Sequence, residues 1–226
     1  LGELIDLFSN QLETTGEGDF MGQVYEYFMN KFARSLGQAG GEFYTPRCIV
    51  KLLVKMINPL SGRVYDPCCG SGGMFVQAAR YMHNHNVSAA DMMKFRCYGV
   101  EKEPDTVKLA KMNLAVRGIS HHLGEKNAST FTIDMHKGLY FDYIMANPPF
   151  NLKKWYEGPQ CDNSIWADYD TPPEGNANYA WILHMLSKLK KGKGVAGFLL
   201  ANGALGDEDA IEIRKKLIEN DKIEAI

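Results

Sequence analysis

The sequence lacks several features that would assign it to a particular class of protein. No run of about 18 apolar residues is present that could span a membrane, and no basic stretch followed by an apolar one opens the chain. The five cysteines are odd in number and form no Cys-x-x-Cys pair, which argues against a disulfide framework and against zinc. We therefore expect a soluble, cytoplasmic protein with reduced thiols, no metal and no membrane partner.

An excess of positive charge is also missing. The 25 Lys and Arg residues are balanced by 27 Asp and Glu, so the formal net charge is −2. Affinity for duplex DNA comes largely from basic side chains that neutralise phosphates. A DNA enzyme of this composition needs a local basic surface or a second polypeptide, and we favour the second. The one basic run, at 188–193, is interpreted as the solvated end of a helix.

The spacing of apolar residues predicts an α/β protein. The first forty residues have helical spacing, and from residue 62 short apolar runs alternate with helical patterns. Strands are predicted at 62–66, 96–101, 141–146 and 194–200, with weaker ones at 129–133 and from 222, and helices at 73–83, 104–117, 177–190 and 208–220. Such alternation predicts a doubly wound, mostly parallel sheet that binds ligands beyond the carboxyl ends of its strands.

The 226 residues are enough for one substantial domain with a short appendage. We expect residues 1–40 to be the remnant of an N-terminal helical region and 41–226 to form the main domain, truncated within a strand at its C-terminal end. Thr45 and Pro46 predict an N-cap and a first helical position. The buried face of that helix is predicted to consist of Ile49, Leu52, Leu53, Met56 and Ile57. The loop at 151–176 is long enough to suggest a function.

A glycine-rich turn follows the first predicted strand. This strand ends in Asp66, and the turn includes Gly70, Ser71 and Gly72, where backbone can approach a ligand closely. The turn has no Gly-Lys-Ser/Thr and departs from G-x-G-x-x-G, so a nucleoside triphosphate and a dinucleotide are both disfavoured as its ligand. An acid at the strand end favours a cationic ligand such as S-adenosylmethionine, and Glu101 after the next strand can accept ribose hydroxyls. The alternative is that Asp66 caps a turn and Glu101 is a solvated strand end.

Asn147-Pro148-Pro149-Phe150 directly follows the predicted strand at 141–146. Two prolines remove two backbone donors and leave carbonyl oxygens, an arrangement that suits a substrate amine. If the Asn147 amide oxygen and the Pro148 carbonyl each accept one amine hydrogen, the nitrogen lone pair is directed at a methyl donor. A base must leave the duplex to reach such a site, and Phe150 offers an aromatic face. The alternative is an ordinary turn followed by a core aromatic.

Together these residues resemble the motifs of amino-group DNA methyltransferases. The resemblance covers the cofactor motif at 66–73, the catalytic motif at 147–150 and a further cofactor segment at 41–46. More narrowly, the amino-acid sequences at 176–182 and 194–203 resemble those of the modification subunit of type I restriction-modification systems. Ser129 stands where many relatives carry an acid near the cofactor adenine, so no contact to the adenine ring is assigned there.

The resemblance implies an S-adenosylmethionine-dependent methyltransferase fold and transfer of a methyl group to N6 of adenine. The implied catalytic residues are Asn147, Pro148, Pro149 and Phe150, and the implied cofactor-binding residues are Glu42, Phe43, Tyr44, Thr45, Pro46, Asp66, Gly70, Ser71, Gly72 and Glu101. The implied partners are DNA with a flipped adenine, a specificity subunit, a second modification subunit and, in some assemblies, a restriction subunit.

Three other functions remain open from the residues themselves. The same amine-capturing loop would serve a methyltransferase that acts on RNA or on a glutamine side chain in protein. A cofactor-binding scaffold without catalysis and a Rossmann oxidoreductase are the remaining alternatives. Assays of methyl transfer to each substrate and of nicotinamide binding would separate them.

Overall fold

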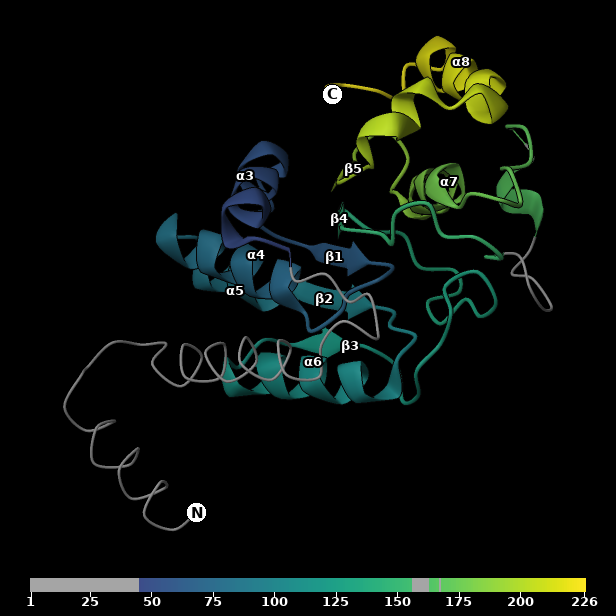
Figure 1. Ribbon diagram of the computed structural model, residues 1–226. Helices are drawn as coiled ribbons and strands as arrows, with labels where there is room; N and C mark the ends of the chain where they lie inside the picture. The colour runs from purple at the N-terminus through teal and green to yellow at the C-terminus, as the bar shows by residue number, and fades with distance from the viewer. Residues whose placement is uncertain (1–44, 156–162, 167) are drawn as a thin grey trace.

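The computed structural model describes residues 45–155, 163–166 and 168–226, which form a layered α/β structure (Figure 1). Its five-stranded sheet has the order β3-β2-β1-β4-β5, and every pairing is parallel. The strands are β1 (Arg63–Asp66), β2 (Arg96–Gly99), β3 (His121–His122), β4 (Tyr143–Ala146) and β5 (Val195–Phe198). The predicted doubly wound, parallel sheet is thereby confirmed. The helix predicted within the first forty residues lies outside the described part of the chain.

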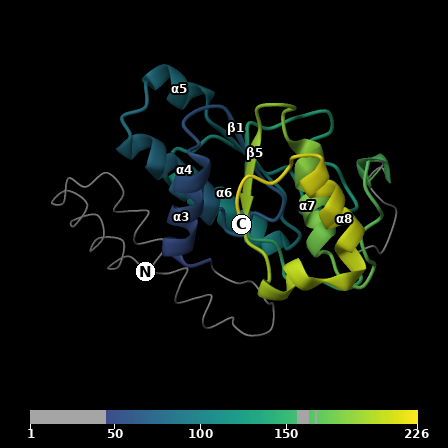
Figure 2. The same cartoon turned by 90° about the horizontal axis from the view of Figure 1, so that it is seen from above.

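Helices cover both faces of the sheet, as the view from above shows (Figure 2). They are α3 (Arg47–Ile57), α4 (Gly73–Asn84), α5 (Ala89–Lys94), α6 (Pro104–Val116), α7 (Asn178–Lys188) and α8 (Ile211–Glu219), with short 3-10 turns at Asn163–Trp166, Asn202–Gly206 and Glu208–Ala210. One apolar core joins α3, α4 and α6 to the sheet, and a second joins α7 and α8 to the opposite face. Among the described residues, no helix has the length and apolarity needed to cross a membrane.

Two of the weaker strand predictions were wrong. Residues 129–133 form a turn, because the backbone amides of Thr132 and Ile133 both donate to the Ser129 carbonyl. The strand beside β2 is instead β3, a two-residue segment for which no strand was predicted. Two residues are too few to show a periodic pattern. Residues 222–226, predicted as the start of a strand, adopt no regular structure.

Helix α3 also differs from its prediction. It begins at Arg47, so Pro46 is the N-cap and not the first helical residue, and no side chain caps it. Its buried residues are Val50, Leu53, Val54 and Ile57, whereas Ile49, Leu52 and Met56 are exposed. The predicted face was displaced by about one position because the apolar stripe of α3 is wider than the side that meets the sheet.

The glycine at position 197 explains how closely α3 approaches β5. A Cβ atom on Gly197 would lie 2.7 Å from Cγ2 of Ile57 and 2.9 Å from Cδ1 of Leu53, too close for any other residue unless these side chains or the helix shift. Glycine at this position therefore allows α3 to pack closely on β5. The N-terminal end of α3 is thereby placed beside the residue that follows β4, as the site geometry shows.

Candidate active site

Two predicted motifs meet at the point where the strand order reverses. From β1 the chain proceeds outward through β2 and β3 on one side, and through β4 and β5 on the other. Asp66 ends β1 and Asn147 follows β4, and these two strands are paired through Tyr65 and Ile144. In open parallel sheets a crevice forms at the carboxyl ends of such strands. The topology therefore places the glycine turn and the Asn-Pro-Pro-Phe loop at one binding crevice.

Backbone hydrogen bonds shape the glycine turn and tie it to the end of β2. A carboxylate oxygen of Asp66 accepts from the Cys68 amide at 3.0 Å, and the Cys69 amide donates to the Val100 carbonyl at 3.0 Å. The Gly70 amide donates to Oε2 of Glu101 at 3.0 Å. Gly70 has a φ of +52°, a conformation that glycine adopts without strain. The turn is thus a defined structure that depends on glycine.

The residues of this turn fit the predicted cofactor. A Cβ atom added at Gly70 would meet no atom within 4 Å, so space in front of the turn is open. The two carboxylate oxygens of Glu101 accept from the amides of Gly70 and Glu103, at 3.0 and 2.9 Å. Each carboxylate oxygen has two lone-pair sites, so these two amide hydrogen bonds alone do not exhaust the acceptor capacity of Glu101.

Burial strongly perturbs the carboxyl group of Asp66. Its side chain is 2% exposed, and desolvation raises its pKa from 3.8 to about 7, with a further increase from the negative charge of Glu101. The hydrogen bond from the Cys68 amide acts in the opposite direction. No cation of the described residues contributes to this pKa, and a buried acid of this kind is stabilised in its ionised form when a cation arrives. The site is therefore suited to a ligand with a positive charge.

The Asn147 amide group is held by one hydrogen bond and is unsatisfied at its other end. Its Nδ2 donates to Oγ1 of Thr45 at 2.8 Å. Its Oδ1 is buried, and no donor within the described residues reaches it. Buried acceptors in native proteins are usually satisfied, so an exception indicates a partner that enters the site. Pro148 is buried beside it, and the Phe150 ring is 46% exposed.

The loop that carries Asn147 is attached to the first turn of α7. Asn151, which has a φ of +54°, donates its amide to Oδ1 of Asn178 at 3.0 Å, and Nδ2 of Asn178 donates to Oδ1 of Asn151 at 3.0 Å. Asn178 is 2% exposed. In the sequence, Asn178 is marked only by the family resemblance at 176–182, because its partner is 27 residues away and no local pattern marks the pair.

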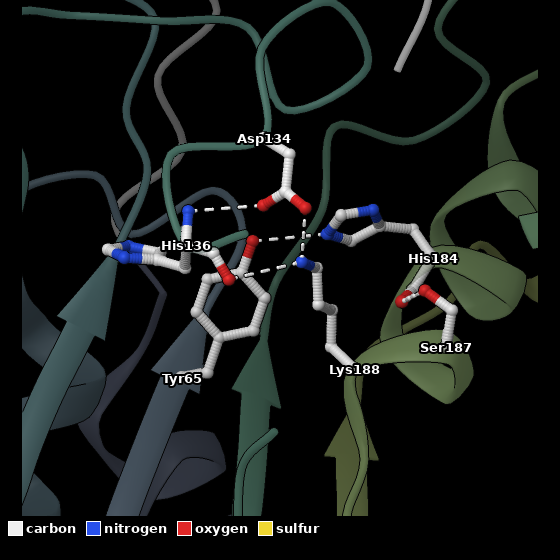
Figure 3. Close-up of polar contacts among 6 residues, drawn as sticks. All are labelled: Tyr65, Asp134, His136, His184, Ser187 and Lys188. Carbon is white, nitrogen blue, oxygen red and sulfur yellow. Dashed lines mark hydrogen bonds and ion pairs between the residues drawn. The ribbon is translucent and has the colours of Figure 1, made fainter. Parts of the chain in front are cut away.

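A buried polar cluster lies between the sheet and α7 (Figure 3). Its members are Tyr65, Asp134, His136, His184, Ser187 and Lys188. The Tyr65 hydroxyl lies 3.1 Å from Nε2 of His184, and burial lowers the pKa of His184 to about 3, so that this ring stays neutral. The Lys188 ammonium lies 2.5 Å from a carboxylate oxygen of Asp134 and is 10% exposed. The prediction of a solvated helix end was therefore wrong for Lys188, whose charge is neutralised inside the protein.

This cluster supports the glycine turn through the segment 127–136. Asp134 pairs with Lys188 at one end of that segment. At the other end the Ala128 amide donates to the Glu101 carbonyl at 2.9 Å, and the Thr130 hydroxyl donates to the Pro67 carbonyl. Segment 127–136 thereby connects α7 to the start of the glycine turn and to the residue Glu101 that follows β2.

The structure brings together some of the predicted site residues and leaves others undescribed. Thr45 lies at Asn147, while Asp66, Gly70 and Glu101 are connected as described above. The Ser71 carbonyl accepts from Nδ2 of Asn113 at 2.7 Å, which attaches the turn to α6. Glu42, Phe43 and Tyr44 lie outside the described residues. No group of three His, Cys, Asp or Glu side chains in the described ranges could hold a metal ion.

Comparisons with known proteins give one consistent answer. The type I restriction enzyme HindI methylase subunit of Haemophilus influenzae is 45% identical over 213 residues, which are 93% of this chain and 47% of that protein. The MjaIX methylase subunit of Methanocaldococcus jannaschii is 39% identical over 220 residues, 92% of this chain and 37% of that protein. The chain thus spans less than half the length of both relatives.

A solved structure agrees with these sequence relatives. The crystal structure of the type I restriction-modification system methyltransferase subunit from Streptococcus thermophilus matches with a TM-score of 0.76 at 28% identity, and covers 91% of this chain and 44% of that one. The model of the N-6 DNA Methylase family matches residues 16–226, nearly the whole chain. Together with the parallel sheet and its strand order, this match shows that the chain belongs to the N-6 DNA methylase family.

Proposed function

We propose that this chain is the catalytic part of a type I modification subunit and transfers a methyl group from S-adenosylmethionine to N6 of adenine in DNA. The observation that carries this proposal is the Asn147 amide at the end of β4, whose Oδ1 is buried without a donor in the described part of the chain. Such an acceptor matches a substrate amine, which brings hydrogens to donate. The family and the named relatives support adenine in DNA as the substrate.

The cofactor is proposed to bind across the ends of β1 and β2. Asp66 would face its positively charged methionine end, the backbone of Gly70, Ser71 and Gly72 would border it, and Glu101 would accept its ribose hydroxyls. The family resemblance implies an additional cofactor contact from residues Glu42 to Pro46. When bound, the cofactor supplies an electrophilic methyl group on a sulfonium.

The chain's own contribution is to position and polarise the amine. Oδ1 of Asn147 and the Pro148 carbonyl each accept one N6 hydrogen, which turns the nitrogen lone pair away from the purine ring. Neither residue has to remove a proton before attack, so positioning and electrostatics carry the reaction. The new N–C bond forms as the sulfur–methyl bond breaks, the sulfonium leaves as a neutral thioether, and the methylated nitrogen then releases one hydrogen to water as a proton. The exposed Phe150 ring stacks on the flipped base and holds it out of the duplex.

The low net charge is the reason to propose that other chains bind the duplex and recognise its sequence. With a formal net charge of −2, the chain has no overall excess of the basic side chains that neutralise DNA phosphates. We propose a specificity subunit and a second modification subunit as its partners, with a restriction subunit joining some assemblies. Residues 41–226 would then form the catalytic domain, and the segment before them a helical region.

A methylation assay tests the proposal directly. The protein is incubated with labelled S-adenosylmethionine and duplex DNA, with and without a specificity subunit, and N6-methyladenine is measured. We expect methylation that depends on the added subunit. Asn147→Ala should reduce the rate at least about a thousandfold, while cofactor affinity by calorimetry changes less than about threefold. Transfer to RNA or to protein glutamine, with none to DNA, would overturn the assignment of the substrate.

A further inference from the structure

The hydroxyl of Thr45 contacts the side-chain amide of Asn147, on which the proposed reaction depends. Its Oγ1 accepts a hydrogen bond of 2.8 Å from Nδ2 of Asn147, although the two residues are 102 positions apart. The Asn147 amide has two ends, and only Oδ1 can accept a hydrogen from the amine. Holding Nδ2 on one side therefore directs Oδ1 toward the other, where it has no donor among the described residues.

We infer that Thr45 is a positioning residue for catalysis, which orients the Asn147 amide so that its oxygen faces the target amine. The inference rests on the proposed function and deepens it. A hydroxyl can donate as well as accept, so the contact serves catalysis only in the orientation that the structure has, with Nδ2 as donor. An amide turned by 180° would present two hydrogens to a substrate that itself donates, and would repel it.

The surrounding structure makes Thr45 a rigid support. Pro46 follows it directly, and a residue before proline is restricted to extended backbone. Helix α3 begins one residue later and is buried at Val50, Leu53, Val54 and Ile57. Gly197 lets this helix lie tightly on β5, the neighbour of the strand that carries Asn147. The Thr45 hydroxyl, two residues before α3, therefore links this packed helix to the Asn147 side chain.

This role differs from the contact with the cofactor that the family resemblance assigns to Thr45. If Thr45 contacts only the cofactor, removing its hydroxyl lowers the affinity for S-adenosylmethionine and leaves the rate at saturating cofactor unchanged. If Thr45 positions Asn147, removing its hydroxyl lowers that rate and leaves the affinity unchanged. The two roles are therefore separated by measuring the rate and the affinity on the same variant.

The test compares Thr45→Val, which keeps the shape and removes the hydroxyl, with Thr45→Ser, which keeps the hydroxyl. Thr171→Val, at an exposed position, serves as the matched control. At saturating cofactor and DNA, with the specificity subunit present, we expect a single-turnover rate about 10 to 100 times lower for Thr45→Val. Thr45→Ser should stay within about threefold of wild type, and the dissociation constant for S-adenosylmethionine should change less than about twofold in both.

Provided that the wild-type protein methylates DNA, three outcomes would overturn the inference. They are an unchanged rate in Thr45→Val, a loss of cofactor affinity with a normal saturated rate, and a failure of Thr45→Ser to restore the rate. A double-mutant cycle of Thr45→Val and Asn147→Ala, read by urea unfolding, tests the contact without any assay of activity. Non-additive effects on stability are expected, and additive ones would count against the contact. A wild-type protein that methylates no DNA would instead contradict the proposed function.

Discussion

Asn151 and Asn178 exchange two hydrogen bonds of 3.0 Å each, and so join the end of the Asn-Pro-Pro-Phe loop to the start of α7. Replacing Asn178 with Leu keeps the size and leaves the Asn151 amide and side chain without these partners. We expect a methylation rate about tenfold lower or more, because the loop is then held less firmly. Cofactor affinity should hardly change. Asn84→Leu, at an exposed helix end, is the control, and an equal loss in both variants would contradict the positioning role.

Gly70 is the position at which the glycine turn depends most on glycine. A valine there would adopt φ near +52° only with strain, and its side chain would enter the space proposed for the cofactor. We expect Gly70→Val to abolish calorimetric binding of S-adenosylmethionine. Gly192→Val has a comparable φ of +70° and equally open surroundings, but it lies in the turn before β5, at the opposite edge of the sheet. Cofactor binding that is retained in Gly70→Val would argue against a site at this turn.

Asp66 should make cofactor binding depend on pH. Its pKa is about 7 in the free protein, and a cation at this site would favour the ionised form. Affinity should therefore rise about tenfold between pH 6 and pH 8, and level off above. The stability of the free protein should change in the opposite direction. Its free energy of unfolding should fall as the pH rises from about 4 to about 7, because the buried acid must then ionise in the folded state.

The control for this pH dependence is Asp66→Asn, which has no acid to ionise. Subtracting its profile also removes any titration of the ligand itself. Among the described residues, the other titratable groups near Asp66 are Glu101, Cys68, Cys69 and Tyr65. Burial raises the pKa values of the two thiols and of the tyrosine, so that they stay neutral. If the wild-type and Asn profiles are parallel, Asp66 does not face the charge of the cofactor.

The ion pair between Lys188 and Asp134 should stabilise the fold and support the cofactor turn. Lys188→Met would leave the Asp134 carboxylate, 30% exposed, without its cation. We expect the free energy of unfolding in urea to fall by about 2 kcal/mol. Cofactor affinity should weaken a few-fold, because segment 127–136 is released from α7. Lys108→Met removes an ion pair in which both side chains are largely exposed, and should have no measurable effect.

Much of the fold could be predicted because the information is local. Four of the strands and the helices that follow them were placed within a few residues, since each shows its own apolar period and its own glycine or proline boundary. The predictions failed for segments that are very short or whose apolar side chains cover a wide part of the helix. Strand β3 has only two residues, and α3 has apolar side chains on a wider stripe than the sheet can cover. Only packing against β5 decides which of those side chains are buried.

The sequence by itself determined which chemical groups are present and where they stand in their strands. Asp66 ends β1, glycines follow it, and Asn147-Pro148-Pro149-Phe150 follows β4, so the motifs and the proposed reaction could be read in order along the chain. Only the tertiary structure decided how these groups are held. Thr45 reaches Asn147, and Asn178 reaches Asn151, because parallel strands and the helices packed on them bring distant segments to one edge of the sheet. A hydrogen bond between residues so far apart in sequence depends on packing and leaves no period or local motif from which it could be predicted.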